Sequence, residues 1–145
     1  EDSPNGREKD FYGTSNNNRN AMTTDGTARI MEEIMQNIIF DEKNINLKNC
    51  LFRQIKEQSQ DKDANNQING FLGEGLPQNI PFWSKAGLMS EARNDAAWWI
   101  NKNQSKTLLV VFTEGKEFAN DNNFLPEFSK AIYEFIHSEK LINLP

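Results

Sequence analysis

The sequence contains a single cysteine, Cys50, and a single histidine, His137. One cysteine cannot form an intrachain disulfide or a cysteine-rich metal site, and one histidine gives a serine–histidine or zinc scheme only one candidate residue. Cys50 lies between Leu47 and Leu51 in a predicted helix, where we interpret it as a small buried side chain. We therefore predict neither a metal site nor a cofactor.

Basic clusters and long apolar runs are missing as well. The 145 residues include 16 basic and 21 acidic side chains, for a net charge of -5. A nucleic-acid-binding protein needs clustered basic residues to displace phosphate counterions, so we predict no nucleic-acid partner. No apolar run approaches the roughly 20 residues that cross a bilayer, so we predict no membrane span. No targeting segment is visible at Glu1, which resembles an internal position of a longer chain.

The first half of the sequence predicts two helices after a polar segment. Residues 1–20 are rich in turn-forming residues and predict a loop. A helix capped by Thr23 or Thr24 follows, and a second helix is predicted over residues 47–58, before a solvated connection over residues 59–70. The predicted buried stripe of the first helix consists of Ala28, Met31, Ile34, Met35, Ile38 and Ile39.

The second half predicts a small antiparallel sheet and a closing helix. We expect strands over residues 80–85, 95–101 and 106–113, the last two joined as a hairpin by a short polar segment. Residues 108–112 are apolar at every position, which predicts a strand covered on both faces. The closing helix begins at Leu125-Pro126. Its predicted buried stripe consists of Phe128, Ala131, Ile132, Phe135 and Ile136.

Four patterns occur in an order that matches a known family. Asn-Ala-Met-Thr-Thr-Asp opens the helix segment over residues 20–31, and Gly75-Leu76-Pro77 precedes the first strand. Trp83-Ser84-Lys85-Ala86-Gly87 is followed by Arg93-Asn94-Asp95-Ala96-Ala97, and an apolar strand and a closing helix come last. Over residues 19–138, this ordered set resembles the class A β-lactamase-like serine hydrolases.

This resemblance implies an α+β fold, a three-layer α/β/α sandwich with an antiparallel sheet. Residues 1–145 would form the carboxyl-terminal part of one domain, with an omega-loop-like segment at 1–20 and the helices and last three strands at 21–145. The resemblance also implies a serine acyl-enzyme whose nucleophile lies on a missing upstream segment. The expected partners are that amino-terminal half and a small-molecule β-lactam or peptidoglycan-like substrate, in an extracytoplasmic location.

The resemblance assigns roles to the residues of the third pattern. Lys85 matches the lysine of the family's Lys-Thr-Gly motif, whose ammonium lies beside the nucleophile. Gly87 would allow close approach of the substrate, and the backbone N–H of Leu88 would complete the oxyanion hole. Arg93 resembles the arginine that some members place near the substrate carboxylate.

The sequence also departs from the family pattern. Ala86 replaces the usual Thr or Ser, which removes a hydroxyl at a substrate-binding position, and Leu88 replaces a small residue. Glu8 lies where the omega-loop glutamate would activate water, but Tyr12 replaces the asparagine that normally follows.

The serine motifs of the family have only weak counterparts in this sequence. Ser59-Gln60-Asp61-Lys62 is the only Ser-x-x-Lys sequence, and we interpret it as a chance match because it lies in the solvated connection. Ser15-Asn16-Asn17 could mimic the family's Ser-Asp-Asn motif, but it lies too close to Asn20. We therefore expect the nucleophile to lie outside this sequence.

Two alternatives to an active hydrolase remain open at this point. Ala86 and Leu88 are compatible with a catalytically impaired penicillin-binding or peptide-binding module of the same fold. A plain α/β interaction domain that shares only local patterns is the other alternative.

Overall fold

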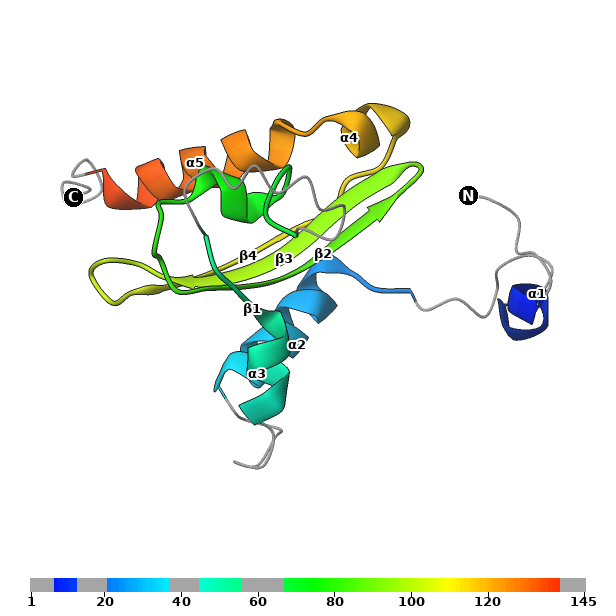
Figure 1. Ribbon diagram of the computed structural model, residues 1–145, viewed down its shortest axis with the longest axis horizontal. Helices are drawn as coiled ribbons and strands as arrows, with labels where there is room; N and C mark the ends of the chain where they lie inside the picture. The colour runs from blue at the N-terminus through cyan, green and yellow to red at the C-terminus, as the bar shows by residue number, and fades with distance from the viewer. Residues whose placement is uncertain (1–6, 13–20, 37–44, 56–66, 139–145) are drawn as a thin grey trace.

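The computed structural model describes residues 7–12, 21–36, 45–55 and 67–138 (Figure 1). Its centre is an antiparallel sheet in the order β1-β2-β3-β4. The strands are β1 (Phe52–Arg53), β2 (Phe82–Met89), β3 (Ala92–Ile100) and β4 (Lys106–Val111).

Helices cover both faces of this sheet in Figure 1. One face carries α2 (Thr24–Gln36) and α3 (Ile45–Leu51). The other carries the 3-10 helix η2 (Leu72–Gly75), the short helix α4 (Lys116–Asn120) and α5 (Phe124–His137). The three-layer α+β architecture is therefore confirmed, with η2 and α4 as elements that the sequence did not predict. The helix α1 (Arg7–Tyr12) lies to one side of these layers, within a segment that the sequence predicted to be a loop.

The hairpin of β2 and β3 is longer than predicted. Leu88 pairs with Arg93 and Met89 with Ala92, so the strands continue up to a tight turn at Ser90 and Glu91. Most of the residues between the two predicted strands therefore form paired β-strand and not a loop. A two-residue turn allows the hydrogen-bonded pairing of β2 and β3 to continue to the tip of the hairpin. This extension places Lys85 in the middle of a regular strand.

A fourth strand replaces the second half of a predicted helix. The helix expected over residues 47–58 ends at Leu51, and Phe52 and Arg53 pair with Trp83 and Phe82. The Arg53 guanidinium bonds the Cys50 carbonyl oxygen at 2.7 Å, and such bonds satisfy carbonyls at the end of a helix. Phe52 packs edge-on against Trp83, with 5.7 Å between ring centroids. Cys50 is exposed, contrary to the predicted buried position.

Each face of the sheet has its own apolar core. Phe82, Trp99 and Leu125 are fully buried on the side of η2 and α5, and Met31 and Trp98 are buried on the side of α2. The strand β4 serves both cores, as its uninterrupted apolar run predicted. Its core-contacting side chains are Leu109 and Val111 on the first face and Leu108 and Val110 on the second.

The two long helices differ in how well their faces were predicted. Thr23 caps α2, where its Oγ1 atom accepts the N–H of Gly26 at 3.0 Å. In α5 the buried positions are Leu125 and Ser129, whereas Phe128 and Phe135, predicted to be inside, are 37% and 63% exposed. The Ser129 hydroxyl donates to the Leu72 carbonyl oxygen at 2.7 Å, so contact with η2 selects the inner face of α5.

Candidate functional site

The outer edge of β2 is only partly covered by β1. The strand β1 pairs with Phe82 and Trp83, and no other strand of the described residues pairs with this edge. Alternate residues of an antiparallel strand direct their N–H groups to opposite sides. The Ala86 N–H bonds Gln67 Oε1 at 3.2 Å on the outer side, so the N–H of Leu88, two residues further on, also faces outward. The predicted Lys-Thr-Gly-like segment therefore lies on an open strand edge.

The Lys85 side chain lies on the α2 face of the sheet. It lines an apolar groove of about 320 Å³ between β2, β3 and α2, and among the described residues of the lining it is the only charged one. Its Nζ atom donates to the carbonyl oxygen of Ala86. Lys85 is exposed in the described structure, so its ammonium would act more strongly on nearby charge only where another segment covered the groove and reduced solvent screening. The remaining lining residues include Thr27, Ile30, Met31, Ile34, Ala96 and Phe112.

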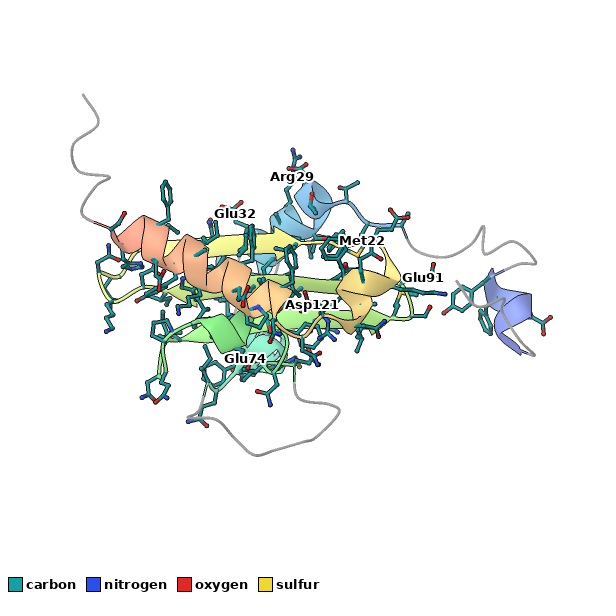
Figure 2. All side chains as sticks on the ribbon, turned by 90° about the horizontal axis from the view of Figure 1, so that it is seen from above. Met22, Arg29, Glu32, Glu74, Glu91 and Asp121 are labelled. Carbon is teal, nitrogen blue, oxygen red and sulfur yellow. The ribbon has the colours of Figure 1, made fainter. Side chains whose placement is uncertain are left out.

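This groove continues toward the β2–β3 turn. A second hollow of about 550 Å³ shares Met22, Asn94 and Phe112 with the groove and ends at Glu91 and Glu114. Figure 2 shows Met22 and Glu91 at this end of the molecule. The groove that holds Lys85 therefore adjoins a hollow lined by Glu91 and Glu114 near the tip of the hairpin.

The neighbours of Lys85 lie in different environments. The Ala86 side chain is buried in the core on the η2 side, and Leu88 on the same face is 56% exposed. A Cβ atom built on Gly87 would meet nothing within 4 Å, so contacts within the described chain leave room for a larger residue there. The structure brings Lys85, Gly87 and the Leu88 backbone together on one strand, as their sequence proximity requires.

Arg93 does not lie open at this edge. It is 5% exposed, and its guanidinium bonds the carbonyl oxygens of Gly70, at 3.1 Å, and Ala119, at 2.9 Å. The same group donates to Asn122 Oδ1 at 2.7 Å and lies 5.1 Å from the centroid of the Phe71 ring. Burial lowers the pKa of Arg93, although the charge of Asp121 acts in the opposite direction. These contacts give Arg93 an architectural role, in which it joins the segment before η2 to α4.

Glu8 is a predicted site residue on a helix apart from this edge. It belongs to α1, which lies apart from the sheet in Figure 1, and its side chain is outside the described part of the structure. The described structure therefore does not bring Glu8 and Lys85 together. The two serine motifs, at residues 15–17 and 59–62, also lie outside the described residues.

Asp95 is a buried carboxyl to which the sequence reasoning assigned no role. It is 1% exposed, its Oδ2 atom accepts the Leu72 N–H at 3.1 Å, and its Oδ1 atom has no partner among the described residues. Burial raises the pKa of Asp95 to about 7, although the backbone N–H groups of Leu72 and Ala96 and the charges of Lys85 and Arg53 act to lower it. The signal in the sequence is a carboxylate directly before the apolar run of residues 96–100 in β3.

The raised pKa of Asp95 predicts that stability falls as the pH rises from about 4 to 7. Across this pH window the folded protein keeps a proton on Asp95, whereas the unfolded chain has released it. The free energy of unfolding therefore falls by at most about 1.4 kcal/mol for each unit of pH. Asp95→Asn keeps an acceptor for the Leu72 N–H but does not titrate, and it should remove this slope. Urea unfolding from about pH 4 to 8 measures it, with exposed Asp10→Asn as control. Parallel curves for wild type and Asp95→Asn would contradict the prediction.

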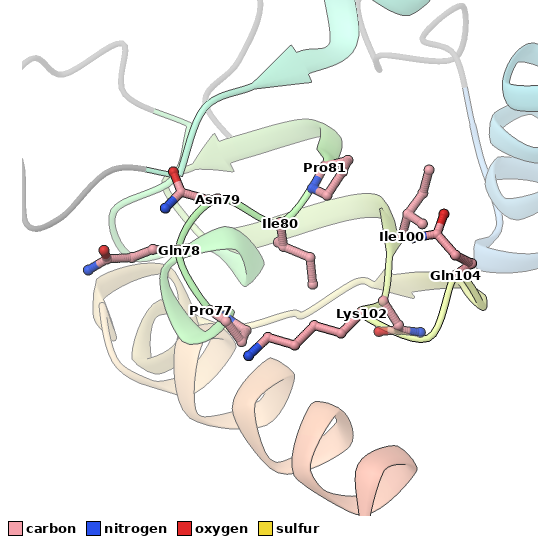
Figure 3. Close-up of a pocket in the computed structure, with 9 residues that line it drawn as sticks. Pro77, Gln78, Asn79, Ile80, Pro81, Ile100, Lys102 and Gln104 are labelled. Atoms are coloured by element: carbon pink, nitrogen blue, oxygen red, sulfur yellow. The ribbon is translucent and has the colours of Figure 1, made fainter.

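A separate cavity lies at the other end of the strands (Figure 3). It has a volume of about 240 Å³ and is formed by residues 77–81 and the β3–β4 hairpin. Two of its lining residues, Asn79 and Gln104, adopt left-handed backbone conformations with φ values of 60° and 66°. Lys102 is its only ionisable lining residue, so it offers no acid–base pair or activated nucleophile from the described chain.

Neither metal ligands nor a membrane-spanning helix is found in the described part of the chain. No group of three or more His, Cys, Asp or Glu side chains there could hold a metal ion. Within the same residues, every helix is too short or too polar to cross a membrane.

An antiparallel sheet between two helical layers, with a lysine beside an open strand edge, defines an α+β protein with a candidate ligand site at the sheet edge. Residues 4–136 match the sequence model described as the beta-lactamase enzyme family. The chain therefore belongs to this family, which argues against an unrelated interaction domain that shares only local patterns. A search of curated proteins finds no significant match.

Two solved structures share the fold. A β-lactamase from Burkholderia vietnamiensis superposes with a TM-score of 0.65 at 13% sequence identity, over 88% of this chain and 46% of that one. A structure of PBP-A superposes with a TM-score of 0.60 at 15% identity, over 81% of this chain and 44% of that one. The chain thus spans less than half the length of either protein, and at these identities the likeness establishes the fold alone.

Proposed function

We propose that this chain is the carboxyl-terminal part of a β-lactamase-like hydrolase that acts through a serine acyl-enzyme. The nucleophilic serine would lie on an upstream segment. The observation that carries the proposal is Lys85, a single charge in an apolar groove beside the outward-facing N–H of Leu88. Membership of the beta-lactamase enzyme family supports a hydrolase of this general kind.

The proposed chemistry needs a fixed positive charge and an oxyanion-binding N–H. Attack of a serine hydroxyl on the acyl carbonyl forms a tetrahedral intermediate with negative charge on the carbonyl oxygen. Collapse of this intermediate breaks the scissile C–N bond and leaves an ester, while the proton lost by the serine passes to the leaving nitrogen. The Leu88 N–H would donate to that oxygen, and pairing of Leu88 with Arg93 holds the donor in place before the reaction. Lys85 would favour the anionic groups of substrate and intermediate. Water then hydrolyses the ester, with Glu8 as the proposed base if α1 is brought to this edge.

Three uncovered surfaces support a missing upstream half. They are the groove at Lys85, the outer edge of β4, which has no strand partner among the described residues, and the exposed Phe128 and Phe135 on α5. Exposed apolar patches and open strand edges are typical of surfaces that another segment covers. We propose that the upstream half covers them and that an apolar helix in the groove presents the serine to Lys85.

Covalent labelling of the full-length protein tests this function. A fluorescent penicillin should label one serine outside residues 1–145, which peptide mapping by mass spectrometry would identify. Labelling of Ser59, or no labelling at all, would overturn the serine acyl-enzyme proposal.

A catalytically impaired binding module is the second candidate. Ala86 is buried in the core and supplies no hydroxyl, and the large Leu88 side chain lies beside the proposed oxyanion site. Stable labelling by penicillin without turnover of a chromogenic cephalosporin would favour this module, whereas rapid turnover would exclude it.

We propose a β-lactam or peptidoglycan-like substrate and an extracytoplasmic location on the basis of family membership. Fractionation of cells that express the full-length protein would test the location. Recovery of the protein only with cytoplasmic markers would contradict it.

A further inference from the structure

Gln67 occupies a position on the open edge of β2 that a neighbouring strand would otherwise fill. Its side-chain oxygen Oε1 accepts the Ala86 N–H at 3.2 Å, which is the bond that a partner strand would make with its carbonyl group. The sequence around Gln67 gave no indication of this contact, because Gln67 and Ala86 are 19 residues apart.

Arg53 holds the Gln67 amide in place. Its Nη2 atom donates to Gln67 Oε1 at 3.3 Å, and its Nη1 atom bonds the carbonyl oxygens of Cys50, at 2.7 Å, and Phe52, at 2.9 Å. The guanidinium is therefore fixed to the backbone where α3 passes into β1. A glutamine that accepts a bond from this fixed guanidinium loses less conformational freedom on bonding Ala86 than a free side chain would.

These contacts divide the edge of β2 into a closed part and an open part. The strand β1 covers Phe82 and Trp83, and Gln67 covers the N–H of Ala86. No bond to the outward N–H of Leu88 is found within the described residues. Successive outward positions are about 7 Å apart along a strand, so a ligand bound at Leu88 alone does not reach Gln67.

We propose that Gln67 is a specificity-determining residue that limits this edge to compact acyl ligands and disfavours extended peptides. The inference rests on the proposed function, because it concerns which acyl groups reach the Leu88 N–H. A ligand that continues along β2 to Ala86 must first displace the glutamine amide. The displaced contact is one hydrogen bond, so the expected penalty is about three- to tenfold in rate or affinity.

Acylation of the full-length protein by two probes tests the proposal. A fluorescent penicillin is the compact probe, and an N-acylated tripeptide thioester long enough to pair with both Leu88 and Ala86 is the extended probe. Gln67→Ala should raise the acylation rate constant for the thioester about three- to tenfold and change that for the penicillin less than twofold. Gln67→Glu keeps the acceptor and adds a charge toward Arg53, so it should lower the thioester rate further.

Gln78→Ala, which removes an exposed amide at the other end of the sheet, is the matched control and should leave both rates unchanged. Equal changes for the two probes, or no change for the thioester in Gln67→Ala, would overturn the inference.

Two further readouts separate this inference from the proposed function. Hydrogen exchange should show the Ala86 amide protected in the wild type and in Gln78→Ala, and unprotected in Gln67→Ala. If neither probe acylates the wild type, the acyl-enzyme proposal fails. The role of Gln67 is then tested by the equilibrium affinity for the corresponding tripeptide amide, compared between the wild type and Gln67→Ala. An affinity that does not rise in Gln67→Ala, or Ala86 protection that survives the substitution, would overturn the inference.

Discussion

Replacing Lys85 by alanine should lower the rate constant for acylation of the full-length protein by a fluorescent penicillin about 100- to 1000-fold. Lys85 is the only charged residue among the described residues of the groove lining, so none of these could take over its electrostatic role. Because Lys85 is exposed in the described structure, its removal should leave folding intact. Stopped-flow or gel-based labelling measures the rate, and thermal unfolding confirms that the variant is folded.

Two variants control this experiment. Lys102→Ala removes an exposed lysine in the β3–β4 hairpin that lines the separate cavity of Figure 3 and not the groove, and it should label at the wild-type rate. Lys85→Arg keeps the charge on a bulkier planar group and should recover part of the rate. Acylation of Lys85→Ala at the wild-type rate would show that the groove lysine takes no part in the chemistry.

Replacing Gly75 by alanine should destabilise the fold by about 3 kcal/mol, at the upper end of the usual range for overpacking. An added Cβ would collide with the Pro126 carbonyl oxygen and the Ser129 hydroxyl, and it would lie 2.8 Å from the Pro126 carbonyl carbon. These atoms belong to the first turns of α5, and Ser129 is also bonded to the Leu72 carbonyl oxygen, so α5 cannot move away without breaking that contact. Equilibrium unfolding in urea measures the change.

Gly87→Ala is the matched control, because it adds the same methyl group at a position in β2 where nothing lies within 4 Å. Its free energy of unfolding should stay within about 0.5 kcal/mol of the wild type, as for most substitutions at uncrowded surfaces. Equal stability of the Gly75 and Gly87 variants would show that η2 and α5 pack less closely than the structure indicates.

Local sequence signals determined much of the fold. Thr23 followed by an apolar stripe predicted a capped α2, and the uninterrupted run over residues 108–112 predicted a strand in contact with both cores. The position of Lys85 on a strand followed from its aromatic and apolar neighbours. These features depend on hydrogen bonds and side-chain spacings within a few residues, so the sequence by itself was sufficient for them.

The tertiary structure alone decided which surfaces meet. The guanidinium of Arg93 is buried because its acceptors come from Gly70, Ala119 and Asn122, which are 23 to 29 residues away. The inner face of α5 is set by Ser129 and η2, and the closed part of the β2 edge is set by Gln67. Each of these contacts joins groups that are distant along the chain, and periodicity within one segment carries no information about the partner that another segment supplies.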